Sequence, residues 1–306
     1  MEQSPEQPDD QSTQNQPAID PQSMNQPAID QQQADEIRQN VRESYTEVAE
    51  ASNTGGCCGE QSSCCGVSDD AAINPLVSTR LGYREGDLES VPEGADMGLG
   101  CGNPRAIASI NNGETVLDLG SGGGFDCFLA AAETGESGHV IGIDMTPTMI
   151  SKARGNAVKG QYEHVEFRLG EIEHMPVAND MVDVIISNCV INLSPDKSQV
   201  FSEAFRVLKP GGRLAISDVV ASTVLPDEIR EDLALYSGCM AGASLVSELQ
   251  SILEHSGFQD IRIEPKDDSK EFIKDWAPGR GVEDYVISAT IEAVKPGGCC
   301  SGGSCC

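Results

Sequence analysis

The chain has 306 residues, which is long enough for one large domain or two ordinary ones and for a sizeable hydrophobic core. It carries 49 acidic and 20 basic residues, which gives a formal net charge of −29. A surface this negative repels nucleic-acid phosphates and anionic lipid headgroups, so we expect neither as a partner. No run of apolar residues reaches the roughly 18 that a membrane-spanning helix needs, and the N-terminus lacks the pattern of a signal peptide. We therefore expect a cytoplasmic protein.

The excess of acidic residues also indicates that the protein works at high salt concentration. Self-repulsion destabilises a compact acidic chain in dilute buffer, and salt removes this penalty because the Debye length falls to about 3 Å at 1 M. We therefore expect a halophilic protein from a salt-rich cytosol. The alternative is an ordinary acidic protein with a disordered acidic tail.

The N-terminal region divides into a tail and a helix. Residues 1–34 are rich in Gln, Pro, Asp and Ser, and they contain the hexapeptide Asn-Gln-Pro-Ala-Ile-Asp twice. Such a segment buries too little apolar surface to offset its ordering entropy, so disorder is expected. From Asp35 onward, apolar residues at helical spacing predict a helix to about Ala51. With the cysteine-rich stretch that follows, this helix forms a predicted N-terminal segment, 35–73.

Residues 74–294 alternate strand-like apolar runs with helical patterns, which predicts an α/β domain with a mostly parallel sheet. The predicted strands cover residues 115–120, 139–144, 165–170, 182–188, 212–218, 260–264 and 285–293. The main predicted helices cover residues 125–132, 147–157, 196–208 and 245–255. We divide this region into a ligand-binding domain, 74–225, and a small C-terminal α+β region, 226–294, which is expected to contribute a substrate lid. A cysteine-rich tail, 295–306, completes the chain.

A glycine-rich turn follows the first predicted strand. The sequence from Asp118 to Gly124 reads Asp-Leu-Gly-Ser-Gly-Gly-Gly and leads directly into a helix. Glycines here let the backbone approach a ligand at the carboxyl edge of the sheet. The second strand ends in Asp144, about 20 residues further on, where a carboxylate can accept hydrogen bonds from both ribose hydroxyls. The pattern predicts a nucleoside site, and the alternative is a structural turn without a ligand.

The acid before the turn indicates which nucleoside. A dinucleotide site uses G-x-G-x-x-G to seat a pyrophosphate and needs no acid at Asp118, whereas a carboxylate there suits a cofactor with a cationic amino-acid end. The arrangement resembles the class I S-adenosylmethionine-dependent methyltransferases, which implies a Rossmann-like sheet. The resemblance implies that the methionine part lies against Gly120, Gly122 and Gly124, the ribose against Asp144, and the adenine against Met145, Glu171 and Ile172, with Asn188 at the end of the fourth strand.

The 12 cysteines fall into two groups. Eight form adjacent pairs in Gly/Ser-rich segments, at positions 57/58, 64/65, 299/300 and 305/306. Of the four single ones, Cys127 lies in a helix and is expected in the core, whereas Cys101, Cys189 and Cys239 lie in loops of small residues. Thiols in a reducing cytosol indicate soft metal or metalloid binding, or redox chemistry. Zinc remains possible, although its usual C-x2-C spacing is absent.

The three cysteine loops indicate which methyltransferase family the sequence resembles. The segments LGCGNP, LDLGSGGGFDC, GIDMT, SNCVINL, FRVLKPGG, SDV and SGCMAGA occur in this order across residues 74–264 and resemble the arsenite methyltransferases. The resemblance implies that Cys101, Cys189 and Cys239 bind trivalent arsenic. It also implies that a cysteine in the 57–65 cluster assists as a redox partner. The implied substrates are arsenite and methylarsenite, with cellular thiols or a thioredoxin-like protein as reductant, in arsenic detoxification.

The implied chemistry is physically consistent. Trivalent arsenic is thiophilic and keeps one lone pair when thiols hold it, so it can attack an activated methyl group without a general base. Methylation formally oxidises arsenic, so a further round needs electrons, which a cysteine pair can supply by forming a disulfide.

Two other functions stay open at this point. The first is a metalloid-buffering or metalloid-sensing protein on a methyltransferase scaffold, which the eight paired cysteines favour. The second is a methyltransferase for a carbon or oxygen of a small metabolite. The paired cysteines themselves are either mobile arms that capture arsenic or idle thiols.

Overall fold

The computed structural model describes residues 30–51 and 75–298. The predictions for the tail, for the cysteine-rich stretch after the first helix and for all eight paired cysteines fall on residues 1–29, 52–74 and 299–306, outside the described residues. The helices are α1 (Gln31–Ala51), α2 (Pro75–Arg80), α3 (Glu85–Glu89), α4 (Arg105–Ala108), α5 (Phe125–Thr134), α6 (Pro147–Gly160), α7 (Lys197–Val207), α8 (Asp227–Arg230), α9 (Leu233–Ser237), α10 (Val246–His255) and α11 (Lys270–Trp276). Short 3₁₀ turns are η2 (Ile191–Leu193), η3 (Asp267–Ser269) and η4 (Val282–Asp284).

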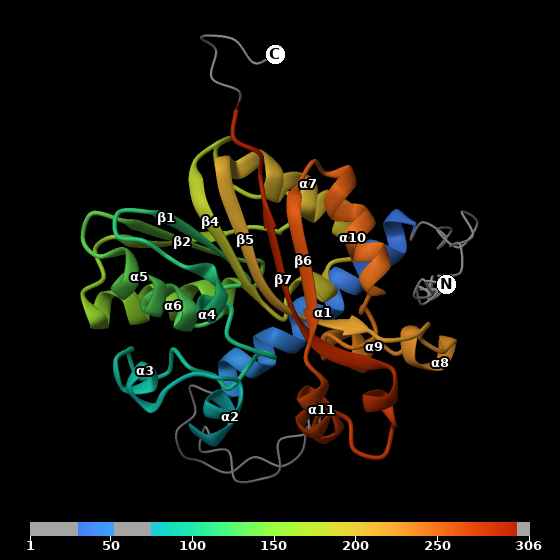
Figure 1. The fold of residues 1–306 in the computed structure, drawn as a ribbon. Helices are drawn as coiled ribbons and strands as arrows, with labels where there is room; N and C mark the ends of the chain where they lie inside the picture. The colour runs from blue at the N-terminus through green and yellow to red at the C-terminus, as the bar shows by residue number, and fades with distance from the viewer. Residues whose placement is uncertain (1–29, 52–74, 299–306) are drawn as a thin grey trace, which may run out of the picture.

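Seven strands form one mixed sheet, which confirms the predicted α/β class (Figure 1). They are β1 (Thr115–Leu119), β2 (His139–Asp144), β3 (Val165–Leu169), β4 (Val182–Asn188), β5 (Leu208–Ala221), β6 (Gln259–Pro265) and β7 (Val286–Val294). Their order is β3-β2-β1-β4-β5-β7-β6, and β7 runs antiparallel to both of its neighbours. β1 pairs in parallel with β2 on one side and β4 on the other, so the strand order reverses between β1 and β4. Ligands bind at such a switch point in open α/β sheets, at the carboxyl ends of the strands.

Helices cover both faces of the sheet, because side chains along each strand point alternately to the two faces. On β1, Val116 packs in one apolar cluster with residues of α4, α5 and α6, whereas Leu117 and Leu119 pack in another with residues of α7 and α10. Both clusters are buried, so the sheet is the middle layer of three.

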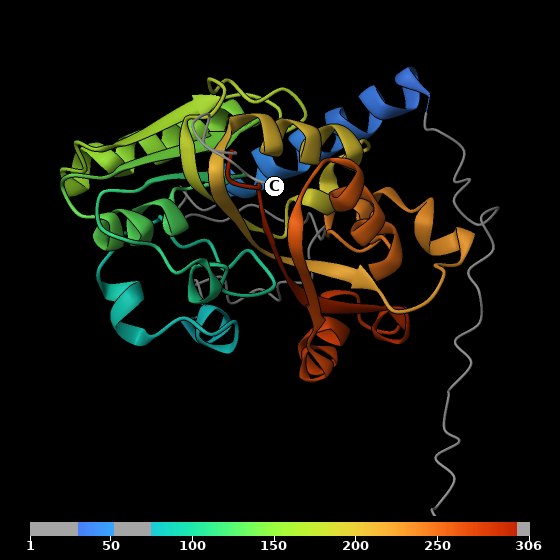
Figure 2. The same ribbon diagram turned by 45° about the horizontal axis from the view of Figure 1, so that its top comes forward.

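A third apolar cluster caps the carboxyl edge of the parallel strands. It joins side chains of α1, α9 and α11 to the loops after β4 and β5, and α1 runs across this edge in both views (Figures 1 and 2). Polar contacts hold α1 in place: Arg38 forms an ion pair with the buried Glu173 (3.2 Å), and the Tyr45 hydroxyl donates to the Ser237 carbonyl (3.3 Å). The first helix of the chain is therefore part of the enclosure around the switch point.

Two predicted boundaries shift by four residues in the structure. Helix α1 begins at Gln31, so the expected disorder is wrong for residues 31–34, because the Asp30 carboxylate accepts the Gln33 N–H (2.8 Å) and caps the helix. Strand β5 begins at Leu208, earlier than predicted, because Leu208 pairs with Val182 before a bulge brings Arg213 opposite Val184. Within the described residues, no helix is both long and apolar enough to cross a bilayer.

Candidate active site

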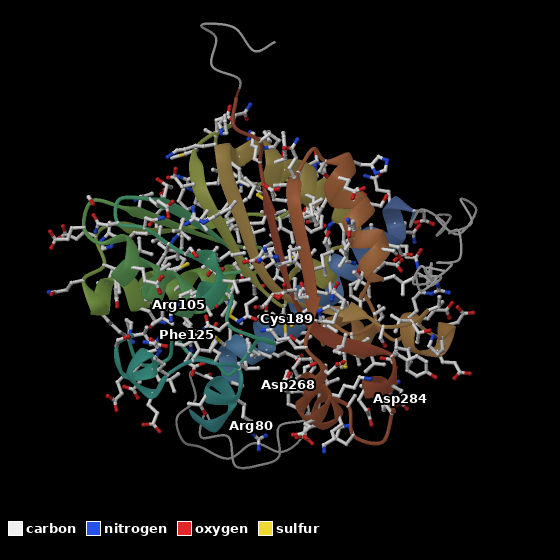
Figure 3. The ribbon with its side chains drawn as sticks, viewed as in Figure 1. Arg80, Arg105, Phe125, Cys189, Asp268 and Asp284 are labelled. Carbon is white, nitrogen blue, oxygen red and sulfur yellow. The ribbon has the colours of Figure 1, made fainter. Side chains whose placement is uncertain are left out.

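A cavity of about 550 Å³ opens at the carboxyl edge of the sheet, which is within the usual size range of small-molecule sites. The loops after β1, β2 and β4 form one wall, and α1, α9 and the chain from Asp275 to Arg280 form the other. Cys189 lies at this edge, beneath the ends of the strands (Figure 3). Parts of the predicted lid region thus line the cavity, while β6 and β7 from the same region complete the sheet.

Asp144 stands at the end of β2 with its carboxylate held by two backbone groups. Its Oδ2 accepts the Gly122 N–H (3.0 Å) and its Oδ1 accepts the Thr146 N–H (2.8 Å). Burial raises the pKa of Asp144, and the two backbone hydrogen bonds oppose this rise. A carboxylate offers about four lone-pair sites, so this fixed group has acceptor capacity left for the hydroxyls of a ligand.

Asp118 is a second buried acid in the lining. Its Oδ2 accepts a hydrogen bond from Cys127 Sγ (3.2 Å). Burial raises the pKa of Asp118, and the nearby charge of Asp126 raises it further, so a cationic ligand group would stabilise the ionised form. Ser121 also lines the cavity, and its buried Oγ has no hydrogen-bond partner among the described residues. The polar groups of this wall therefore fit a ligand with an amine and hydroxyls, such as S-adenosylmethionine.

The glycines of the turn have different roles. Gly120 has φ +71°, and a Cβ there would lie 2.3 Å from Val190 Cγ2, so a side chain cannot be placed at this point. Gly120 and Gly122 line the cavity, whereas Gly124 caps α5 and packs against the rings of Phe128 and Phe167. Gly120, Gly122 and the neighbouring Gly123 therefore stand where a ligand would touch them.

Some of the remaining predicted cofactor residues line the cavity and one does not. Met145, Ile172 and Asn188 line the cavity. Glu171 does not, because its carboxylate turns to α1 and pairs with Arg42 (3.2 Å). The neighbouring Glu173 lines the cavity instead.

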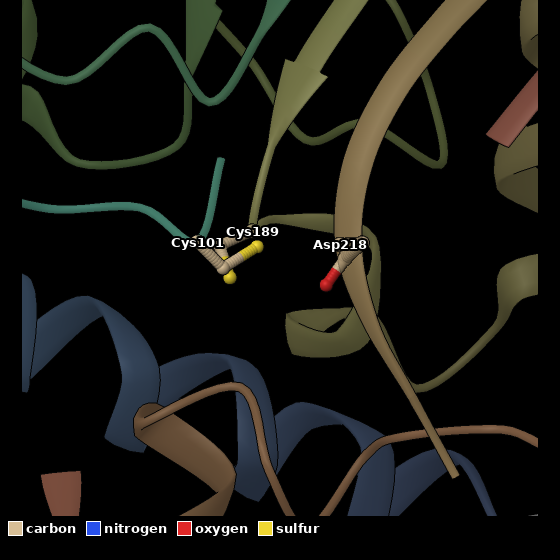
Figure 4. A group of neighbouring side chains, drawn as sticks. All are labelled: Cys101, Cys189 and Asp218. Atoms are coloured by element: carbon tan, nitrogen blue, oxygen red, sulfur yellow. The ribbon is translucent and has the colours of Figure 1, made fainter. Parts of the chain in front are cut away.

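The structure brings the three loop cysteines together. Cys101 Sγ, Cys189 Sγ and a carboxylate oxygen of Asp218 lie within 4.8 Å of one another (Figure 4). Cys239 Sγ donates to the Cys189 carbonyl. Cys189 and Cys239 line the cavity, and Cys101 is buried beside Cys189. Cys127, in contrast, is buried at Asp118 on the other side, as expected for a core residue.

The backbone at two of these cysteines is unusual. Cys189 has φ +58° and Cys239 has φ +64°. These values lie in the left-handed region, which residues other than Gly, Asn and Asp seldom adopt. Glycine would fit these positions at lower cost, so the thiols themselves account for the residue type. This backbone feature gives no signal in the sequence.

Burial determines the protonation of the thiols. It raises the pKa of Cys101 and raises that of Cys189 further, with the neighbouring cysteines adding to the second effect. Both side chains are therefore neutral thiols near neutral pH. A divalent cation requires thiolates and must displace their protons. Neutral arsenous acid has no such cost, because each thiol proton leaves with an arsenic hydroxyl as water.

Sequence reasoning missed several residues of this site, Glu173 among them. Arg38 and Tyr45 of α1 and Trp276 at the end of α11 line the cavity. Asp218 belongs to the quoted SDV segment, yet its position in the cysteine cluster follows only from the pairing of β4 with β5. Burial raises the pKa of Asp218 to about 6.

The sequence also matches known proteins. The methyltransferase domain family profile matches residues 110–257. An arsenite methyltransferase of Halobacterium salinarum is 52% identical over 86% of this chain and 67% of its own length. One from Aquipseudomonas alcaligenes is 37% identical over 84% of this chain and 67% of its own length.

Solved structures show the same fold. An arsenic(III) S-adenosylmethionine methyltransferase from Chlamydomonas reinhardtii is 33% identical, with a TM-score of 0.54 and coverage of 74% of both chains. A phosphoethanolamine N-methyltransferase from Haemonchus contortus is 20% identical, with a TM-score of 0.52 over 63% of this chain and 51% of its own, and shares the fold alone.

Proposed function

This chain belongs to the arsenite methyltransferase family, and on that premise we propose that it transfers methyl groups from S-adenosylmethionine to trivalent arsenic held by its own thiols. One observation carries the proposal: two of the three converging thiols line the same cavity as Asp118 and Asp144. A methyl donor and an arsenic acceptor would thus share one enclosed space.

When bound, S-adenosylmethionine supplies an electrophilic methyl group on a sulfonium. Asp144 would accept hydrogen bonds from its ribose hydroxyls, and Asp118 would face its cationic amino-acid end. Residues of α1 and α11 line the same cavity, and the lower local dielectric of such a lining would strengthen the interaction of these carboxylates with positive charge.

The cysteines provide the acceptor side. Thiol ligation holds trivalent arsenic as a pyramid and leaves its lone pair free to act as the nucleophile. No side chain is then needed as a general base, and within the described residues no histidine lines the cavity. Cys101, Cys189 and Cys239 therefore orient arsenic rather than activate it.

The finer parts of the cycle follow from electron balance. Each methylation raises the formal oxidation state of arsenic by two, and two thiols that form a disulfide return those electrons. We expect a cellular thiol or a thioredoxin-like protein to reduce that disulfide. The cytoplasm is the compartment we expect. A salt-rich cytosol fits both the charge of −29 and the Halobacterium relative.

The test is product analysis of arsenite incubated with S-adenosylmethionine and a thiol reductant in molar KCl. We expect methylated arsenicals from the wild type and none from Cys189→Ser. Cys127→Ser is the matched control, because it removes a buried thiol outside the cysteine cluster and should still bind arsenite. Stoichiometric arsenic binding by the wild type without methyl transfer would instead support a metalloid-buffering protein.

A further inference from the structure

Two asparagines flank Cys189 in the sequence, and each reaches one of the other two cysteine loops. Asn188 Oδ1 accepts the Cys101 N–H (3.0 Å), and its Nδ2 donates to the Gly102 carbonyl (2.8 Å). Asn192 Nδ2 donates to the Cys239 carbonyl (3.2 Å). The loop after β4 is therefore the element through which the cysteine loops are joined.

Asn192 is itself fixed by the end of β5. Its Nδ2 also lies within hydrogen-bond distance of Asp218 Oδ1 (3.0 Å) and of the Val219 carbonyl (2.6 Å), so its two hydrogens are shared among three acceptors. The Asp218 carboxylate in turn accepts the backbone N–H groups of Ile191 (2.9 Å) and Val219 (2.7 Å). Asn192 is 1% exposed, so no water competes for these hydrogen bonds.

The Cys239 loop also packs against the backbone of Asn192. A Cβ on Gly242 would lie 2.0 Å from the Asn192 carbonyl oxygen, so the two loops touch at a point where only glycine fits. Cys239 has a left-handed backbone, and such a conformation persists only where its surroundings enforce it. Asn192 contributes to this enforcement through its contacts with residues 239 and 242, together with the hydrogen bond from Cys239 Sγ to the Cys189 carbonyl.

We propose that Asn192, anchored by Asp218, is a positioning residue that holds Cys239 in register with Cys189 for shared ligation of trivalent arsenic. The inference rests on the proposed function and adds a residue to it. Asn192 does not line the cavity, so it acts through Cys239 and not by touching arsenic or the methyl donor. Asn188 does line the cavity, which makes Asn192 the cleaner residue to test.

The experiment compares two buried asparagines with opposite expected effects. Asn192→Leu removes the donor to Cys239. Asn156→Leu makes the same chemical change on the cofactor side, where Asn156 Nδ2 donates to the Gly123 carbonyl (2.9 Å). Both are made in the full chain with the eight paired cysteines changed to serine, so that those thiols do not bind arsenic. Arsenite affinity, S-adenosylmethionine affinity and the number of sulfurs around arsenic by X-ray absorption are measured in molar KCl, without added thiol.

We expect Asn192→Leu to weaken arsenite binding about 10- to 100-fold, as is typical for residues that orient a ligand, and to lower the sulfur number by one. Its S-adenosylmethionine affinity should stay at the wild-type level. Asn156→Leu should show the reverse. A folded Asn192→Leu protein with wild-type arsenite affinity and sulfur number would overturn the proposal. If this variant does not fold, Asn192→Ser, which keeps a hydroxyl but shortens the side chain, is held to the same two outcomes.

The assay separates this inference from the proposed function. Methyl transfer by the wild type tests the function. The sulfur number of the variants, measured without S-adenosylmethionine, tests the role of Asn192.

Discussion

Arsenite binding should be almost independent of pH between about pH 6 and pH 8. Burial raises the pKa of Cys101 and of Cys189 above the ordinary thiol value, so both remain protonated across this range. Arsenous acid is neutral there, and each thiol that replaces a hydroxyl releases one water and no net proton. The observed affinity should therefore carry no proton dependence from these two groups.

Zinc, the alternative ligand, shows how large a pH dependence would be. A zinc ion held by the same two thiols would displace two protons, so its affinity would rise about 100-fold per pH unit. Over two pH units this amounts to about 10⁴-fold, or about 5.5 kcal/mol. Arsenite and zinc therefore differ by several orders of magnitude in the same pH range.

Calorimetric titration in buffers of different ionisation enthalpy measures this directly, because the buffer dependence reports the protons released. The titration of Cys189→Ser is subtracted from that of the wild type, since thiols outside the cluster also bind arsenite. Release of about one proton or more per arsenic, with affinity rising tenfold per pH unit, would refute the assignment of neutral buried thiols.

Three further predictions concern solvent, cofactor and stability. The net charge of −29 predicts that Tm rises with KCl up to molar concentrations, and a Tm that falls above 1 M would contradict the halophilic interpretation. Asp144→Asn should weaken S-adenosylmethionine binding about 10- to 100-fold by calorimetry, because a hydrogen bond to a charged acceptor is lost; unchanged affinity would remove Asp144 from the site. Arg213→Met should lower the free energy of unfolding by about 1 to 2 kcal/mol at pH 7. Burial raises the pKa of Glu114, but the hydrogen bonds from Arg213 and Asn111 bring it below its ordinary value, so the pair stabilises the fold above about pH 4.3 and loses this effect as pH falls further. Chemical denaturation of the wild type and the variant at pH 7 and at pH 3 measures this effect. An equal loss of unfolding free energy at the two pH values would contradict it.

The strands were predictable because each is a short apolar run bounded by turns. β2 and β4 have the predicted bounds, and β1 and β3 end one residue earlier. Short helices such as α3 and α9 were not predicted, since five residues give too little periodicity to distinguish a helix from a loop. The early start of α1 depends on one cap at Asp30 within a polar segment, where hydrophobic pattern carries no signal.

The site was predictable to the extent that it lies at strand ends. Asp118 lies within β1 and Asp144 ends β2, so the strand pattern of the sequence indicated both. Glu171 shows the limit, because the direction of its side chain is decided by the arginines of α1. That helix lies more than 100 residues away in the chain, and nothing near Glu171 in the sequence records it.

The cysteine cluster depends on the register of the sheet. Asn188 of β4 pairs with Ser217 of β5, and the residues that follow them in the sequence are Cys189 and Asp218. The Cys189 N–H donates to the Ser217 carbonyl (2.8 Å), so this thiol is attached to the sheet itself. Cys101 is attached to β7, because the side-chain hydroxyl of Ser288 donates to the Cys101 carbonyl (2.9 Å). A slip of one residue between β4 and β5 would turn the side chains of one strand to the opposite face and separate this cluster. Two of the proposed arsenic ligands, Cys101 and Cys189, are thus hydrogen-bonded to strands of the sheet, which sets their spacing.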